Sequence, residues 1–134
     1  MGHRLVLVLV ANPRSDVEAQ VEAAIGRYAE SDDDNPDSKY DWYTFGGRWN
    51  GIFAGKFVGA SAEKDGAGGR VEGNVCPVAE LPADLEPAVI ATPDGAWHYY
   101  GWRPPGDSGP LPPPMNEVLG QYRDHYAVAV DAHA

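Results

Sequence analysis

Residues 125–134 read HYAVAVDAHA, and the alternation of their side chains predicts a β-strand at this end of the sequence. Successive side chains of a strand point to opposite faces. One face carries the larger apolar side chains, Tyr126, Val128 and Val130. The other carries small residues followed by titratable ones, Ala127, Ala129, Asp131 and His133. We therefore expect room above the sheet on this second face, beside two titratable groups.

A second strand and a helix are expected near the start of the sequence. Residues 5–10 (LVLVLV) form an apolar, strand-forming run that ends before Asn12-Pro13. Ser15 and Glu18 have the spacing of a helix capping box. Apolar residues then recur at helical intervals: Val17, Val21, Ala24, Ile25 and Tyr28. The chain is thus predicted to open with a strand and an amphipathic helix.

Two further elements complete the predicted fold. Residues 87–92 and 96–102 flank the turn-forming residues 93–95 (PDG), which predicts a β-hairpin. A short helix is expected over 115–123. Elements in this order favour an α+β fold: a small mixed or antiparallel sheet with two helices packed on one face, ferredoxin-like in its general plan.

The length of the chain, 134 residues, predicts a single domain spanning 1–134. Three segments inside it carry the composition of connections rather than of helices or strands. They are an acidic loop (31–38), a glycine-rich loop (59–74) and a proline-rich connector (103–114).

The charge balance restricts the partners that the protein can have. Twenty acidic and ten basic side chains give a formal net charge of −10. Nucleic-acid binding is therefore not expected, because its affinity is built on Lys and Arg residues that neutralise phosphates. The apolar run at 5–10 is far shorter than the roughly 20 residues of a membrane span. We expect an acidic, cytoplasmic protein without membrane association.

Cysteine and histidine usage gives no sign of a metal or cofactor. Cys76 is the single cysteine, so a disulfide within the chain and a four-cysteine metal site are both excluded. The four histidines share no HExxH spacing. The sequence therefore predicts neither a metal nor a cofactor.

Residues 40–51 read YDWYTFGGRWNG and gather aromatic rings around Gly46-Gly47-Arg48. Two glycines between strand-forming residues are typical of a tight hairpin turn, in which Phe45 would oppose Arg48. One face of this hairpin would then join the core: Tyr40, Trp42, Thr44, Trp49 and Phe53. The other would be a recognition surface: Asp41, Tyr43, Phe45, Arg48, Asn50 and Ile52.

The recognition surface suggests how a ligand would be held. The Arg48 guanidinium can stack on a ring and still present hydrogen-bond donors to a carboxylate or phosphate. Tyr43 and Phe45 would supply the rings, and Asp41, Gly46, Gly47 and Asn50 would complete the ligand-binding set. The alternative is structural: Arg48 pairs with Asp41 across the hairpin, and a tight turn alone accounts for both glycines.

The pair Asp131 and His133 forms a second candidate cluster. A carboxylate that orients an imidazole makes a general acid–base pair, with Arg48 stabilising developing negative charge. As metal ligands the two residues would need a further partner, such as His98 or His125. The alternative is an exposed chain end without a chemical role.

Three segments together resemble a family of phage and bacterial proteins. KYDWYTFGGRWNG at 39–51 is similar to the family's KWDWYxIGGRWxG segment, TPDGAW at 92–97 to its TPDGxW segment, and VAVDAHA at 128–134 to its VVDCHI-like last strand. No function is established for that family, so the resemblance implies only that the matching positions belong together. Where the relatives have Cys between Asp and His, this chain has Ala132, so no thiol can act there.

Two functions of different classes follow from these observations. The first is a small soluble protein that binds a small anionic or nucleotide-like ligand at the aromatic and arginine site, with acid–base catalysis by the Asp–His pair as its extension. The second is a non-catalytic, phage-related interaction protein, of an inhibitor or anti-defence type. It would use the same face to bind a protein partner, since Trp, Tyr and Arg dominate interface hot spots.

Overall fold

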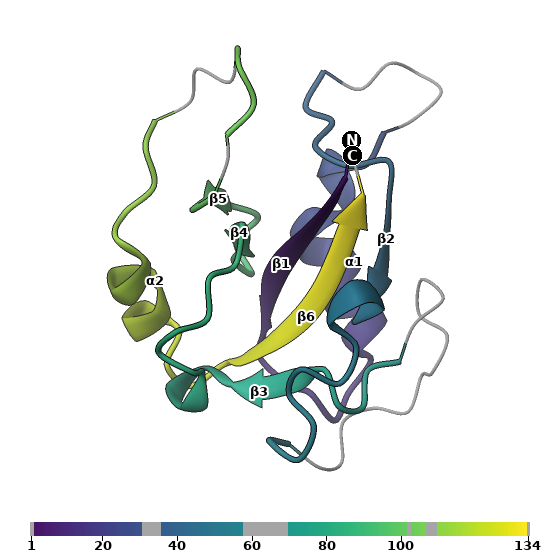
Figure 1. Ribbon diagram of the computed structural model, residues 1–134, viewed down its shortest axis with the longest axis vertical. Helices are drawn as coiled ribbons and strands as arrows, with labels where there is room; N and C mark the ends of the chain where they lie inside the picture. The colour runs from purple at the N-terminus through teal and green to yellow at the C-terminus, as the bar shows by residue number, and fades with distance from the viewer. Residues whose placement is uncertain (1, 31–35, 58–69, 102, 107–109, 134) are drawn as a thin grey trace.

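The computed structural model describes residues 2–30, 36–57, 70–101, 103–106 and 110–133. Within these residues the chain is a mixed α+β structure with an open sheet of six strands and two α-helices (Figure 1). The strands are β1 (His3–Val10), β2 (Trp42–Phe45), β3 (Val75–Pro77), β4 (Val89–Ala91), β5 (Trp97–Tyr99) and β6 (Tyr126–His133). The helices are α1 (Val17–Ile25) and α2 (Met115–Gln121), with short 3₁₀ helices η1 (Gly26–Tyr28), η2 (Gly47–Trp49) and η4 (Val78–Glu80).

Strand β6 lies in the middle of the sheet, whose order is β2-β6-β1-β4-β5. It pairs antiparallel with β1 along its whole length, from His3 opposite His133 to Val10 opposite Tyr126. The other edge of β6 is shared by β2 and β3, which pair with its two halves. Strand β1 pairs parallel with β4, and β4 forms a hairpin with β5. Strand β6 is therefore held between neighbouring strands as far as His133.

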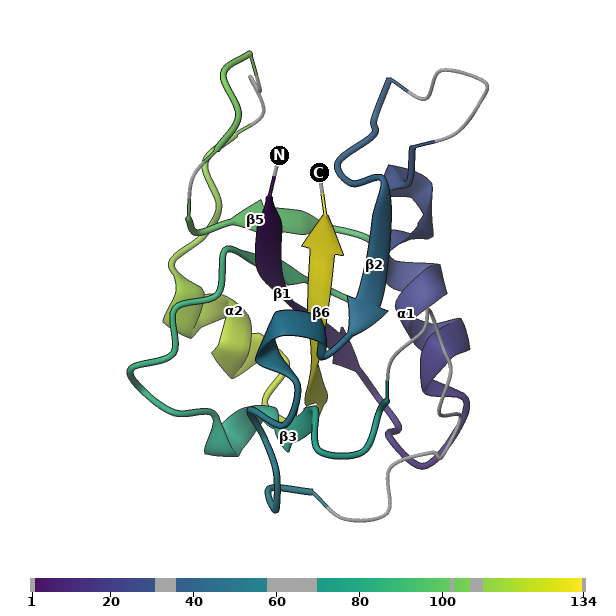
Figure 2. The ribbon, with the colours of Figure 1, turned by 45° about the vertical axis from the view of Figure 1, so that its right-hand side comes forward.

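The two helices cover opposite faces of the sheet (Figure 2). The valines of β1 pack with α1 in one core cluster, and its leucines pack with Val118 of α2 in the other. The expected placement of both helices on one face is therefore wrong, and the ferredoxin-like plan is not confirmed. The reason is visible in β1 itself, because a strand that is apolar at every position from 5 to 10 must be covered on both faces.

Several sequence predictions are confirmed. The first strand, the hairpin around 93–95, the short helix from Met115 and the last strand are all present. The two faces of β6 are also as predicted, with Val128 and Val130 in the α1 cluster and Ala127 and Ala129 in the α2 cluster. One detail differs at the first helix: Asp16, and not Ser15, accepts the capping hydrogen bond, from the Ala19 N–H at 3.0 Å.

The predicted hairpin at Gly46-Gly47 is wrong. After Gly46 the chain enters η2 and a series of turns instead of a return strand. Strand β2 is the edge strand of the sheet and pairs with β6 on one side, but the segment after Phe45 adds no further strand to it. The backbone N–H groups of Arg48 and Gly51 donate instead to the side chains of Asp131 and Asn74. The segment thus lies across the face of β6 (Figures 1 and 2), where Phe53 and Trp49 pack in the same cluster as Ala127 and Ala129. The predicted room above the small residues is thus filled by the chain itself.

The predicted connections are only partly described. Residues 31–35 of the acidic loop, 58–69 around the glycine-rich loop, and 102 and 107–109 at the proline-rich connector lie outside the described residues. The described parts of the connector, 103–106 and 110–114, contain no helix or strand, as expected from their prolines.

Candidate functional site

Two histidine–carboxylate pairs lie side by side where β1 begins and β6 ends. The His3 Nδ1 atom lies 2.8 Å and 3.0 Å from the two carboxylate oxygens of Asp131. The His133 Nδ1 atom lies 2.9 Å from Oδ1 of Asp41. The antiparallel register that sets His3 opposite His133 brings the two imidazoles within 5.3 Å of each other.

Asp131 is the buried centre of this site, with 1% of its surface exposed. Besides facing His3, its Oδ2 atom accepts the backbone N–H of Arg48 at 2.9 Å. The carboxylate thereby links β6 to the start of β1 and to the turn after β2. A buried carboxylate needs such partners, because an unpaired one would carry a large desolvation cost.

The two glycines of the GGR segment are required by this close packing. Gly47 has φ +52°, and a Cβ placed on it would lie 2.5 Å from the Cβ of Asp131. Gly46 has φ +73°, and its Cβ would lie 2.6 Å from the Asn74 side-chain nitrogen. Glycine tolerates both the positive φ and the missing space. The glycines therefore serve the approach of this turn to Asp131 and Asn74.

Asn74 is fully buried and holds the other side of the same turn. Its Oδ1 accepts the Gly51 N–H at 2.8 Å, and its Nδ2 donates to Asn50 Oδ1 at 3.0 Å and to the Arg70 carbonyl at 2.8 Å. Asn50, predicted to contact a ligand, is thus engaged within the protein.

Trp42 and Arg48, two residues of the segment around β2, are both exposed. Trp42 stacks on His133 with ring centroids 5.1 Å apart and planes at 10°, and it meets His3 edge-on at 5.9 Å. It is 46% exposed, which is unusual for a tryptophan. Arg48 is exposed as well, and its guanidinium makes no hydrogen bond or ion pair within the described residues.

A pocket of about 550 Å³ opens beside His3. Its lining includes Trp49 and Tyr100 as aromatic walls, with Arg4 and Glu86 as charged groups. Within the residues that the structure describes, the Nε2 atom of His3 has no hydrogen-bond partner. The imidazole is therefore oriented through Nδ1 while its second nitrogen remains available.

Tyr43 and Phe45, predicted to flank Arg48, belong to the opposite face of the sheet. Phe45 is 1% exposed and packs in the α1 cluster. The Tyr43 hydroxyl donates to Glu22 of α1 at 2.7 Å, and burial followed by this hydrogen bond raises the pKa of Tyr43. The predicted face assignment is wrong because it rested on the hairpin. Pairing of Thr44 with Asp131 places Trp42 and Thr44, not Tyr43 and Phe45, on the site's face.

The predicted catalytic pairing is also corrected. Asp131 and His133 share a face of β6 but do not pair with each other. Asp131 pairs with His3 of β1, and His133 pairs with Asp41, the residue before β2. Asp41 consequently does not pair with Arg48. Sequence reasoning missed His3, although an antiparallel pairing of the first and last strands would have placed it opposite His133.

In the second pair, His133 and Asp41, the contact changes the pKa of the carboxylate. The hydrogen bond from His133 lowers the pKa of Asp41 below its ordinary value, and partial desolvation opposes this effect. Within the described residues, no group of three or more His, Cys, Asp or Glu side chains is arranged to hold a metal ion. His98 and His125 do not join the site.

The three segments of the resemblance do not all meet at this site, although Tyr40 of the first stacks on Trp97 of the second with ring centroids 6.1 Å apart. Residues 39–51 and 128–133 share the site through β2 and β6. The turn of 92–97 lies elsewhere, where the Gly95 carbonyl accepts from Arg27 Nη2 at 2.6 Å and from the Tyr28 hydroxyl at 2.5 Å.

Comparison with protein-family models, with curated proteins and with solved structures finds no match for this chain. A search of the described helices for one long and apolar enough to cross a membrane also finds none.

Proposed function

We propose that the protein binds a small anionic ligand beside His3 and Arg48, and that His3 transfers a proton to or from it. The observation that carries this proposal is the contact of His3 Nδ1 with both oxygens of the buried Asp131. A carboxylate at Nδ1 selects the tautomer with its proton on that atom and stabilises the imidazolium that forms when Nε2 accepts a proton.

The remaining residues have separate roles in this proposal. The backbone N–H of Arg48 is bound to Asp131 and its side chain is exposed, and in this proposal its guanidinium reaches over the site to an anionic ligand or to developing negative charge. Trp42 and His133 form the stacked wall on one side. Asp41 orients His133 as a positioning residue. The pocket beside His3 supplies the volume for the ligand.

The tautomer of His3 can be tested without knowing the ligand. Long-range proton–nitrogen NMR spectra of the neutral imidazole should place the proton of His3 on Nδ1 and leave Nε2 as acceptor. Asp131→Asn should change this spectrum while the other histidines keep theirs. A neutral His3 with its proton on Nε2 would contradict a role as general base.

Ligand binding is tested by thermal shift with inorganic phosphate, sugar phosphates and dicarboxylates. A ligand at a hundredfold excess over its Kd stabilises by about 2.7 kcal/mol. This stabilisation should be lost in Arg48→Ala and retained in Arg123→Ala, a change at an exposed arginine after α2. Equal stabilisation of both variants would place the ligand elsewhere.

The interaction protein is a second candidate because of one observation, the 46% exposure of Trp42 in the same segment as the exposed Arg48. These two residue types are those that anchor protein interfaces. It predicts cooperative melting with no shift from any anion in the panel. An interaction protein would also need no proton transfer at His3. A partner bound through Trp42 should therefore bind His3→Gln as tightly as the wild type.

A further inference from the structure

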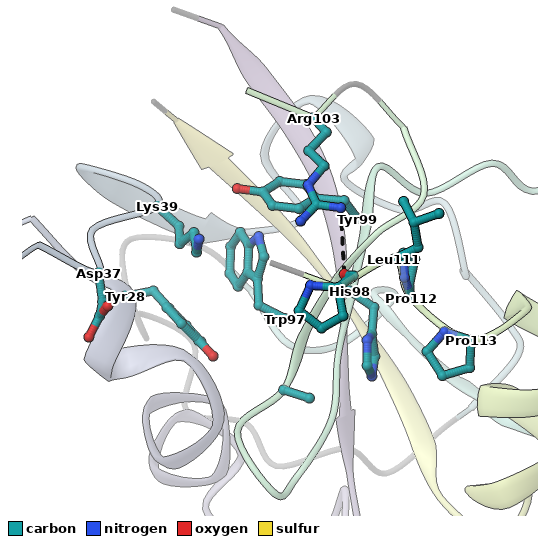
Figure 3. Close-up of a pocket in the computed structure, with 12 residues that line it drawn as sticks. Tyr28, Asp37, Lys39, Trp97, His98, Tyr99, Arg103, Leu111, Pro112 and Pro113 are labelled. Atoms are coloured by element: carbon teal, nitrogen blue, oxygen red, sulfur yellow. Dashed lines mark hydrogen bonds between the residues drawn. The ribbon is translucent and has the colours of Figure 1, made fainter. Parts of the chain in front are cut away.

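The second described part of the proline-rich connector, residues 110–114, reads PLPPP and lies directly before α2. It borders a pocket of about 360 Å³, which Figure 3 shows. Residues 111–113 each precede a proline, and this position disfavours helical backbone angles. Pro114 has φ −53° and ψ 142°, close to the values of a polyproline II helix. We therefore treat 110–114 as a polyproline II segment.

The exposure of the segment follows the period of a polyproline II helix, which has three residues per turn. Pro110 and Pro113 share one edge and are both exposed. Leu111 and Pro114 share a second edge and are exposed as well, Leu111 to 83%. Pro112, on the third edge, is half-buried. Two edges of the segment thus face outward, and the third faces the rest of the chain.

The carbonyl groups of the segment hold it in place. The Tyr100 hydroxyl donates to the Pro113 carbonyl at 2.7 Å. Arg103 Nη1 donates to the Pro110 carbonyl at 3.5 Å, drawn as a dashed line in Figure 3. The Pro114 carbonyl accepts backbone N–H groups from the first turn of α2. The segment is therefore presented to its surroundings in one extended conformation.

The charge of the chain narrows the kind of partner that this segment fits. The formal net charge is −10. Glu117 lies three residues after the segment, in the first turn of α2, and is exposed. Complementary charges across an interface favour association and suppress wrong partners. A partner surface with basic residues is therefore favoured over an acidic one.

We propose that residues 110–114 are a docking segment for a protein domain with an aromatic-lined groove and a basic rim. Such grooves bind polyproline II segments because these are already extended and lose little conformational entropy on binding. The two exposed edges of the segment lie in the groove, and Pro112 points away from it. The proposal goes beyond ligand binding at the His3 site, because no residue of 110–114 lines that pocket.

NMR titration of the whole protein tests the proposal. The probes are a purified WW domain and two purified SH3 domains, one with an acidic and one with a basic rim around its groove. Leu111 is a suitable reporter because the other residues of 110–114 are prolines, which have no backbone N–H. Its amide resonance should shift saturably, and the basic-rimmed SH3 domain should bind more tightly than the acidic-rimmed one. An unmoved Leu111 resonance with all three domains would overturn the proposal.

Three variants locate the contact. Leu111→Ala should weaken binding roughly tenfold, because the leucine would be buried in the groove, and should keep the Tm of the wild type. Tyr100→Phe removes the hydroxyl that holds the Pro113 carbonyl and should weaken binding through lost pre-organisation. Pro105→Ala, at an exposed proline outside the segment, is the control and should bind like the wild type. Unchanged binding by Leu111→Ala, or lost binding by Pro105→Ala, would overturn the proposal.

Discussion

The backbone at Gly47 passes so close to Asp131 that no side chain fits between them. This contact explains at the scale of one residue why the GGR segment is built as it is. The Arg48 N–H reaches the buried carboxylate at 2.9 Å only because the chain approaches without a Cβ in the way. The glycines therefore act on the site through packing, and not through contact with a ligand.

Gly47→Ala should be strongly destabilising. The new Cβ would lie 2.5 Å from the Cβ of Asp131, at a φ of +52°. Left-handed strain of about 1–2 kcal/mol and overpacking of about 1–3 kcal/mol add to an expected loss of roughly 2–5 kcal/mol in the free energy of unfolding. Urea denaturation measures it.

Gly51→Ala is the matched control for this prediction. Gly51 also has a positive φ, +83°, but a Cβ there would meet nothing within 4 Å. Only the strain of about 1–2 kcal/mol should remain. Equal losses in the two variants would mean that the contact with Asp131 is unimportant and that conformation alone explains both glycines.

At the scale of the element, β2 is a short strand that is tied to β6 at both ends. Its pairing with β6 continues into the Asp41 N–H, which donates to the His133 carbonyl at 2.8 Å, and into the side-chain pair of the same two residues. The contribution of this side-chain pair to the stability of the protein depends on the charge of Asp41, so it also depends on pH.

The Asp41–His133 pair should stabilise the protein at neutral pH and fail in acid. The pKa of Asp41 is lowered on folding, so its contribution is fully present above the ordinary carboxyl pKa of 3.8. It is lost as the pH falls through the lowered pKa. Asp41→Asn should accordingly lower the Tm at neutral pH, and its difference from the wild type should shrink below pH 3.8.

This pH dependence is measured by thermal melts of both proteins over a series of acidic buffers. Asp94→Asn provides a comparison at another carboxylate whose pKa is lowered, chiefly by the Thr92 hydroxyl. A difference between Asp41→Asn and wild type that grows in acid would have the wrong sign for the proposed pair.

At the scale of the whole molecule, stability is concentrated around β6, which contacts β1, β2 and β3. Cys76 on β3 is fully buried, and burial, with a smaller effect of Glu80, raises the pKa of its thiol to about 11. The thiolate that reacts with disulfide reagents is thus scarce and covered in the folded protein.

Cys76 should therefore report global unfolding. With Ellman's reagent at neutral pH the folded protein is expected to react very slowly, and the rate should rise with urea in step with the loss of tertiary structure. The denatured protein gives the reference rate for an accessible thiol. Fast reaction without urea would instead reveal local opening of β3 while the rest of the sheet remains paired.

The sequence alone determined where several elements lie and which residues share a face. The alternation in 125–133 and the apolar run in 5–10 depend on neighbouring residues only, because strand geometry repeats every two residues. For the same reason the split of β6 into valine and alanine faces was predictable, and with it the common face of Asp131 and His133. The turn chemistry of 93–95 is equally local.

Only the tertiary structure decided which strands pair and what each side chain meets. Gly46-Gly47 is locally compatible with a hairpin, but the chain after it is held against β6 by the Arg48 N–H, which donates to the distant Asp131. His3 and Asp131 are 128 positions apart and meet at 2.8 Å only through the antiparallel register of β1 and β6. Pairing over such separations depends on the free energy of the whole sheet, and no local pattern of residues encodes it.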